Sequence, residues 1–210
     1  MLRVLIPAAL LLISTLGRAA SPAALTQFLD GVQRFEARFT QVQTDERGLK
    51  IAESSGRMAL QRPGKFRWQV QEGAAQLIVT DGSTLWIYDE DLQQVTQRLA
   101  ADALQGSPAA LLSQRSALAE AFEIRDEGLE SGVRKLHLTP RSKDSDFQDV
   151  QLWLREGAPE RMVFHDTLGG ATDIRFSQAR VNGRLDAALF RFTPPKGVEV
   201  IDSRPTAKVP

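Results

Sequence analysis

Short segments in which hydrophobic and polar residues alternate, each followed by a turn signal, recur through most of this chain and limit its fold more than any other feature. At 35–40, Phe35, Ala37 and Phe39 alternate with polar residues, which predicts a strand with one solvated face. Similar segments follow at 56–60, 65–70, 76–80, 84–88 and 93–96, and Pro63-Gly64 and Asp81-Gly82 are the clearest turns. A parallel return needs a crossover of about a dozen residues, so these strands should form an antiparallel meander.

The second half of the chain repeats this pattern after a change of period. Residues 21–32 and 100–121 have helical spacing, and each region contains a cap followed by a first-turn proline, Ser21-Pro22 and Ser107-Pro108. Strands are then predicted at 122–125, 133–139, 147–155, 161–166, 171–176 and 190–192. The pair Gly169-Gly170 suits a hairpin turn.

These elements predict a mainly β protein with helices, of the α+β class. About eleven strands form too large a sheet to lie flat, so we expect a curved antiparallel open or half β-barrel. The segments 76–79 and 85–88 lack clean alternation, which indicates that both of their faces are shielded from water. We therefore expect the two or three helices to cover an apolar cavity on the concave face.

The N-terminus is typical of a secretory signal. Arg3 precedes an apolar run at 4–16, and small residues surround a cleavage point after Ala19 or Ala20. The run is shorter than the roughly 20 apolar residues of a membrane-spanning helix. We expect residues 1–19 to be removed and residues 20–210 to form a single soluble domain in the periplasm, since 210 residues with 42% hydrophobic content suffice for one core.

Nothing in the sequence advertises catalysis, and we expect no enzyme activity, no cofactor and no metal. The chain has no cysteine and lacks the serine-elbow, zinc-helix and phosphate-loop motifs. His137 and His165 lie in strand patterns beside apolar residues, and the acidic run Asp144, Asp146 and Asp149 lacks the glycine and glutamate of a calcium loop, which favours a solvated hairpin tip. Lys+Arg and Asp+Glu are equal at 26 each without a basic block, so nucleic acid is not an expected partner.

One polar residue stands out because of its neighbours. Arg62 lies in a turn between two strands rich in hydrophobic residues, with Phe66 and Trp68 soon after it. Spacing alone leaves two alternatives open, a solvated turn arginine and a functional one.

The order of several motifs carries a family resemblance. Arg38-Phe39-Thr40-Gln41 comes first, followed by the segment 62–68 (RPGKFRW) and the segment 81–86 (DGSTLW), which continues into Tyr88-Asp89. Ser107-Pro108 before Leu111-Leu112 and the ending 190–198 (FRFTPPKGV) follow in register. In this order the motifs resemble the LolA family of outer-membrane lipoprotein carriers over essentially the whole mature chain. Glu90 and Gly170 depart from the residues common in that family, but both lie in turns.

The resemblance implies an open antiparallel barrel closed by helices, with a cavity for the acyl chains of lipoproteins. It implies transfer from the LolCDE transporter of the inner membrane to the receptor LolB of the outer membrane, by a chaperone that we expect to be monomeric. It also implies that Arg62 holds the lid by hydrogen bonds to helix backbone and that Phe66 is needed to handle cargo. LolB is anchored through a lipid-bearing cysteine, which this chain lacks. Hydrophobicity and position suggest as further cavity residues Leu29, Trp68, Ile78, Trp86, Leu111 and Leu112.

Other functions remain as alternatives. The same cavity would also suit a periplasmic binder of a free lipid or another small hydrophobic ligand. A periplasmic esterase would need a nucleophile and base that no motif reveals, and a structural or signalling partner that senses lipoproteins is the remaining possibility.

Overall fold

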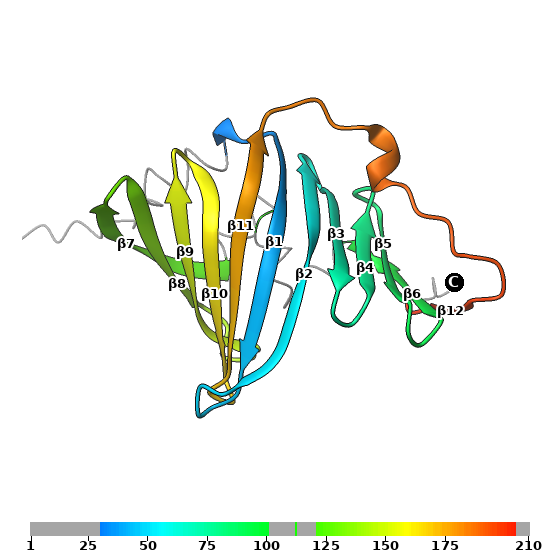
Figure 1. Ribbon diagram of the computed structural model, residues 1–210, viewed down its shortest axis with the longest axis horizontal. Helices are drawn as coiled ribbons and strands as arrows, with labels where there is room; N and C mark the ends of the chain where they lie inside the picture. Colours follow the sequence, from blue (N-terminus) through cyan, green and yellow to red (C-terminus); the bar gives the residue numbers. More distant parts are fainter. Residues whose placement is uncertain (1–29, 101–111, 113–120, 205–210) are drawn as a thin grey trace, which may run out of the picture.

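The computed structural model describes residues 30–100, 112 and 121–204, and Figure 1 shows that these residues form one large curved sheet. The sheet is open, because its strand order runs β12-β6-β5-β4-β3-β2-β1-β11-β10-β9-β8-β7 and the two end strands do not pair with each other. The strands are β1 (Arg34–Thr44), β2 (Lys50–Gln61), β3 (Lys65–Glu72), β4 (Gln76–Thr80), β5 (Thr84–Asp89), β6 (Gln94–Leu99), β7 (Phe122–Glu130), β8 (Val133–Pro140), β9 (Phe147–Arg155), β10 (Ala158–Asp166), β11 (Ala171–Val181) and β12 (Glu199–Asp202).

Two meanders make up the sheet and meet at its middle. Strands β1 to β6 form the predicted N-terminal meander, and β7 to β11 form a second one. The seam is the antiparallel pair β1 and β11, in which Phe39 lies opposite Phe176, while Phe39 lies opposite Gly56 on the other side. The first long strand of the chain and the last thus join the two halves into one sheet.

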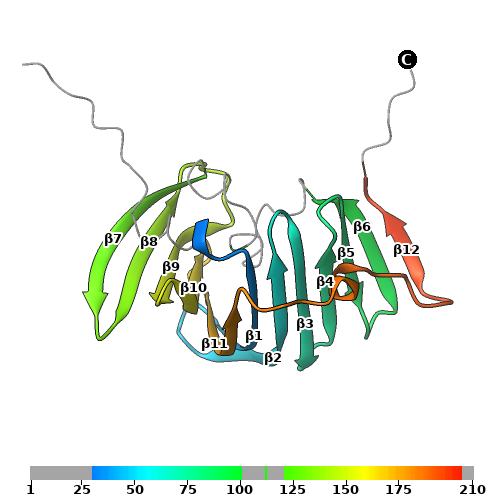
Figure 2. The ribbon, with the colours of Figure 1, turned by 90° about the horizontal axis from the view of Figure 1, so that it is seen from above.

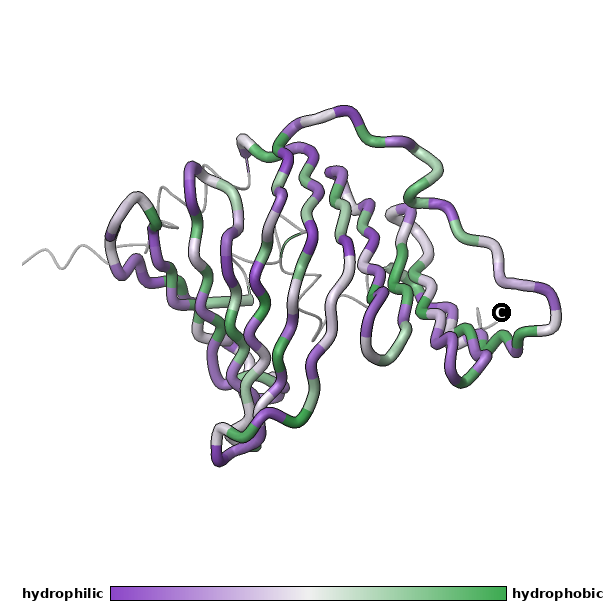
Figure 3. Tube along the Cα trace, viewed as in Figure 1, coloured by the Kyte–Doolittle hydropathy of each residue, from purple (hydrophilic) through white to green (hydrophobic). Residues whose placement is uncertain are grey.

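The sheet is strongly curved and its two faces differ. Figure 2 shows the curvature from above, and Figure 3 shows hydrophobic and hydrophilic residues alternating along the strands. In β1 the residues Phe35, Ala37 and Phe39 are buried, as the alternation predicts. The buried side chains on the same face of β1 to β3 and of β7 to β11 form one hydrophobic cluster. This cluster also includes Val32 and Leu112, which lie outside the sheet.

The C-terminal segment crosses the opposite, convex face. After β11 the chain forms the short 3-10 helix η1 (Ala187–Phe190), capped by Asp186, and then runs to β12. Arg67 on β3 donates a hydrogen bond to the Leu189 carbonyl at 3.2 Å, which fixes this segment against the face that carries Arg67. Figures 1 and 2 show it in orange and red outside the curve of the sheet.

This ending corrects the predicted strand at 190–192. Phe190 ends η1 and is buried, and Phe192 packs its ring against the sheet, so these residues contribute side-chain packing rather than a strand ladder. The other eleven predicted segments correspond to β1 to β11, and the twelfth described strand is β12, which was not predicted and pairs with β6 in parallel. A parallel pair is possible here because β12 is not joined to β6 by a short turn: strands β7 to β11 and the segment after β11 lie between them in the sequence.

The helices predicted at 21–32 and 100–121 lie almost wholly outside the described residues. Of their described members, Asp30, Gly31, Ala100, Leu112 and Ala121 are helical, whereas Val32, the last residue of the first predicted helix, is not. In the part of the chain that the structure describes, no helix is long and apolar enough to cross a membrane.

Candidate functional site

An aromatic wall lines the middle of the concave face. The rings of Phe39 and Trp68 stack with centroids 3.7 Å apart, and Phe66 lies parallel to Trp68 at 6.4 Å. Phe176 meets Trp68 edge-on at 6.5 Å. These side chains come from β1, β3 and β11, and all four are at least nine-tenths buried. Aromatic pairs in offset and edge-to-face arrangements stabilise each other beyond the area that they bury.

Gly56 on β2 makes room for this wall. A Cβ atom there would lie 1.9 Å from the Gln69 carbonyl oxygen and 2.9 Å from Cζ of Phe39. Because real Cβ atoms do not approach backbone so closely, any larger residue would push Phe39 or β3 away. The alternating pattern of β1 and β3 pointed to the aromatic residues, but no local signal pointed to Gly56.

The second meander extends the same face with aliphatic side chains. Leu136, Leu152, Met162 and Ile174 on β8 to β11 are each at most 2% exposed and belong to the same cluster. Among the described residues the one buried polar side chain is Thr80, which accepts a hydrogen bond from the Gly82 amide at 3.0 Å. Apart from the guanidinium of Arg62 at its edge, an apolar chain on this face would therefore meet hydrocarbon.

Arg62 lies at the edge of this face and reaches the end of the first helix. Its Nε donates a hydrogen bond to the Val32 carbonyl at 2.9 Å, and its backbone amide donates to Gln33 at 2.9 Å. Val32 directly follows the helical residues Asp30 and Gly31 and is itself buried in the cluster. The guanidinium thus ties the sheet to the segment that enters β1.

The structure brings together four of the other predicted cavity residues. Phe66, Trp68 and Leu112 belong to the buried cluster, and Ile78 packs against it. Leu112 is 1% exposed although it comes from the segment between β6 and β7, so that segment contacts the concave face at this residue. Leu29 and Leu111 lie outside the described residues.

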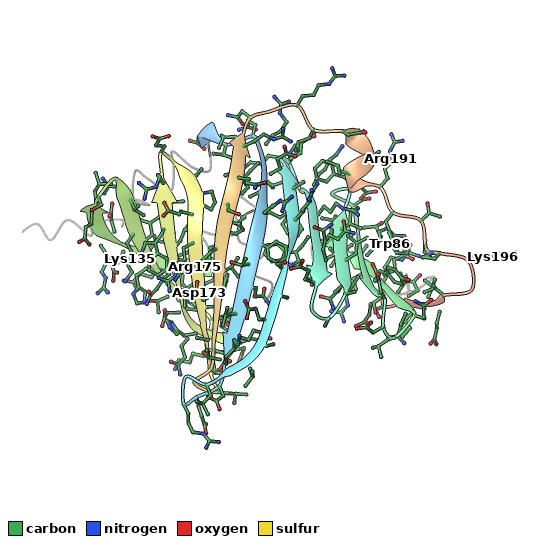
Figure 4. The ribbon with its side chains drawn as sticks, in the orientation of Figure 1. Trp86, Lys135, Asp173, Arg175, Arg191 and Lys196 are labelled. Carbon is green, nitrogen blue, oxygen red and sulfur yellow. The ribbon has the colours of Figure 1, made fainter. Side chains whose placement is uncertain are left out.

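Trp86 lies on the other face of the sheet. It stands opposite Val79 in the ladder, while its neighbour Ile87 stands opposite Ile78, which packs against the concave cluster. The Trp86 ring is 5.9 Å from Phe192 of the C-terminal segment. Figure 4 shows Trp86 beside this segment on the convex side of β5. Both faces of β5 are covered only in part, since Leu85 is buried while Trp86 and Ile87 are half-buried, and the C-terminal segment rather than a helix covers the face of Trp86.

The convex face also carries a groove, whose lining mixes charged residues with Leu129, Val133 and Trp153. The groove has a volume of about 680 Å³ and lies beneath the β7–β8 hairpin. Trp153 at its base is flanked by Lys135 and Arg161, whose charges lie 5.2 Å and 4.7 Å from the ring. Hydrogen bonds from Lys135 and Arg125 lower the pKa of Glu127 from 4.5 to about 2, so this carboxylate stays charged. Figure 4 labels Lys135 at this site. A groove lined by charges does not suit an acyl chain.

The two histidines lie on the convex face as strand residues. His165 Nδ1 is 2.9 Å from Asp149, and His137 Nδ1 is 3.3 Å from Glu127. Asp149 lies within β9 rather than at a hairpin tip. Within residues 30–100, 112 and 121–204, no group of three or more His, Cys, Asp or Glu residues is placed to hold a metal ion.

An open sheet that gathers most of its core on one concave face of hydrocarbon side chains suits the class of proteins that carry hydrophobic groups. The family described as outer membrane lipoprotein carrier protein LolA matches residues 30–193. A relative from Azotobacter vinelandii, named outer-membrane lipoprotein carrier protein, is 42% identical over 200 residues, covering 91% of this chain and 96% of its own. A second, from Dechloromonas aromatica and of the same name, is 40% identical over 190 residues, covering 90% of this chain and 91% of its own.

The chain therefore belongs to the LolA family of outer-membrane lipoprotein carrier proteins. The relatives are named as carriers and not as enzymes. A crystal structure of an uncharacterized conserved protein from Thermus thermophilus has the same fold, with a TM-score of 0.54 and 19% identity, over 86% of this chain and 98% of that one.

Proposed function

We propose that this protein is a periplasmic chaperone that takes the acyl chains of lipoproteins released from the inner membrane by LolCDE and transfers them to the outer-membrane receptor LolB. The observation that carries the proposal is the continuous concave face of hydrocarbon side chains, in a chain that belongs to the lipoprotein carrier family. Each buried methylene stabilises a bound acyl chain by about 0.8 kcal/mol, so cargo with several chains cannot leave a membrane for water unaided.

In this proposal the cargo enters between the sheet and the segments that cover it. The concave cluster is closely packed, with Phe39, Phe66 and Leu112 each 1% exposed. Acyl chains therefore need Leu112 and its segment to move away from the aromatic wall. Helices at 21–32 and 100–121 would form this cover, and Leu29 and Leu111 within them remain predicted cavity residues.

In this proposal Arg62 stabilises the closed arrangement of the cover. Its hydrogen bond to the Val32 carbonyl holds the entry of β1 in the closed arrangement. A carrier must bind its cargo less tightly than the next site does, and a favourable closed state achieves this because loading has to break the contact. Phe66, Trp68 and Ile78 would form the wall that the acyl chains touch.

The remaining parts of the proposal concern the chain itself. Residues 1–19 would serve as the export signal, and residues 20–210 would act as one monomeric domain in the periplasm. The chain contains no cysteine, so it has no residue that could carry the thioether-linked lipid of an anchored receptor such as LolB.

The test is a release assay. Purified protein is incubated with ATP and inner-membrane vesicles that contain LolCDE and a lipoprotein, and vesicles without LolCDE serve as the control. We expect a soluble one-to-one complex of protein and lipoprotein only with LolCDE, followed by transfer to LolB. Absence of release together with tight binding of free lipid would replace this proposal by that of a general lipid binder.

A further inference from the structure

Three exposed aliphatic side chains gather where the longest strands end. Leu49 and Ile51 lie at the β1–β2 turn and are 60% and 66% exposed, and Leu168 at the β10–β11 turn is 84% exposed. The two turns adjoin, because a Cβ atom at Gly169 would lie 3.3 Å from Cβ of Glu46. Figure 1 shows both turns at the lower end of the sheet, and Figure 3 shows hydrophobic segments there. We call Leu49, Ile51 and Leu168 the apolar tip.

The backbone of both turns is satisfied internally. The Asp45 carboxylate accepts hydrogen bonds from the amides of Arg47 and Leu49 at 2.9 Å each, and the Asp45 amide donates to the Leu49 carbonyl at 2.9 Å. In the second turn the Asp166 carboxylate accepts from the amides of Leu168 and Gly170 at 2.8 Å each. A turn whose polar backbone groups are already paired can leave water at a smaller cost in free energy.

Both cations at the tip are paired with carboxylates. Lys50 Nζ lies 2.6 Å from Glu53, and Arg47 Nε lies 3.8 Å from Asp45. These side chains remain exposed and long enough to keep their charged groups in water while the tip moves into a less polar medium. Glu46, where the two turns adjoin, and Asp166 add two further carboxylates, so the tip has a net negative charge and suits a zwitterionic bilayer better than an anionic one.

We propose that the apolar tip touches a lipid bilayer, with Leu49, Ile51 and Leu168 entering the interface between headgroups and acyl chains. The tip is aliphatic and has no Trp or Tyr, and its one arginine, Arg47, is paired with Asp45 in its own turn, which favours a lipid surface over a protein partner. Single exposed apolar residues are ordinary, but three on two adjoining turns form a patch. The proposal is independent of cargo, and it gives the carrier a short contact with the membranes that it serves.

The test uses the mature protein and vesicles of phosphatidylcholine that contain no lipoprotein. Because the chain has no cysteine, Thr167→Cys places one polarity-sensitive dye beside Leu168, and Glu130→Cys places the same dye at the β7–β8 hairpin as a control. We expect the emission of the Thr167 dye to shift to shorter wavelength with vesicles, with little dependence on salt. The Glu130 dye should not respond.

Substitutions then separate the tip from general stickiness. Leu49→Ser, Ile51→Ser and Leu168→Ser should each weaken the vesicle response about fivefold to tenfold, since each removes one inserted aliphatic side chain. Leu129→Ser is the matched control, because Leu129 is 62% exposed but lies at the β7–β8 hairpin, and it should change nothing. No response of the Thr167 dye, or an equal response after the three tip substitutions, would overturn the proposal. Neither result bears on the release assay, so the proposed function would stand or fall separately.

Discussion

Replacement of Arg62 tests how the carrier releases its cargo. Arg62→Leu keeps the aliphatic stem and removes the guanidinium, and with it the 2.9 Å hydrogen bond from Nε to the Val32 carbonyl. A hydrogen bond from a charged donor contributes about 1.5 to 3 kcal/mol. Loss of that amount from the closed state shifts the balance toward the open, loaded state by about tenfold to a hundredfold, since each 1.4 kcal/mol is a factor of ten.

The assay follows cargo from the loaded protein to LolB. We expect Arg62→Leu to take up lipoprotein as well as the unchanged protein does and to deliver it at least tenfold less efficiently. Arg67→Leu is the matched control, because Arg67 also donates to a backbone carbonyl, that of Leu189, but on the convex face. Normal delivery by Arg62→Leu, or an equal defect in both variants, would refute the idea that Arg62 holds the cover closed.

Three further predictions concern stability and are checked by urea unfolding. Gly56→Ala should lower the free energy of unfolding by about 3 kcal/mol, because its Cβ atom would meet the Gln69 carbonyl at 1.9 Å; a loss under about 0.5 kcal/mol would contradict this. Phe192→Ala should cost about 1 to 2 kcal/mol and change the Trp fluorescence without affecting lipoprotein release, whereas a loss of release would link the convex face to cargo. The lowered pKa of Glu127 means that its stabilisation is complete above pH 4.5 and disappears as the pH falls to about 2. Glu127→Gln should therefore remove roughly 0.5 to 1 kcal/mol of acid sensitivity in that window, a small amount because its ion pair with Lys135 is partly exposed; an unchanged pH profile would argue against the lowered pKa.

The convex and concave faces divide the tasks of the protein. The concave face holds almost nothing but hydrocarbon, while ion pairs such as that between Arg161 and Asp173 at 2.8 Å lie on the convex face. Figure 4 shows Asp173 and Arg175 on the same side of the sheet as Lys135. This separation places charged side chains against water on the convex face and hydrocarbon side chains on the concave face.

Local sequence patterns were enough to predict most strands and their turns. The alternation of Phe35, Ala37 and Phe39 predicted which face of β1 is buried, because side chains along a strand point to opposite faces in turn. Asp81-Gly82 predicted a turn, and the Asp81 carboxylate does accept the amides of Ser83 and Thr84 while Gly82 has a φ of +103°. The order of such motifs also indicated the family before any contact was known.

What covers each face was decided only by tertiary structure. The run Leu85-Trp86-Ile87-Tyr88 is apolar on both faces, so the sequence by itself predicted cover on both but not which residue faces the concave cluster, and the cover is partial. The ladder with β4 and the C-terminal segment placed Trp86 against Phe192 and left Ile87 in register with the concave side. The pairing of β1 with β11 likewise joins residues more than a hundred positions apart, and hydrophobic periodicity is a local property that holds no information on such distant partners.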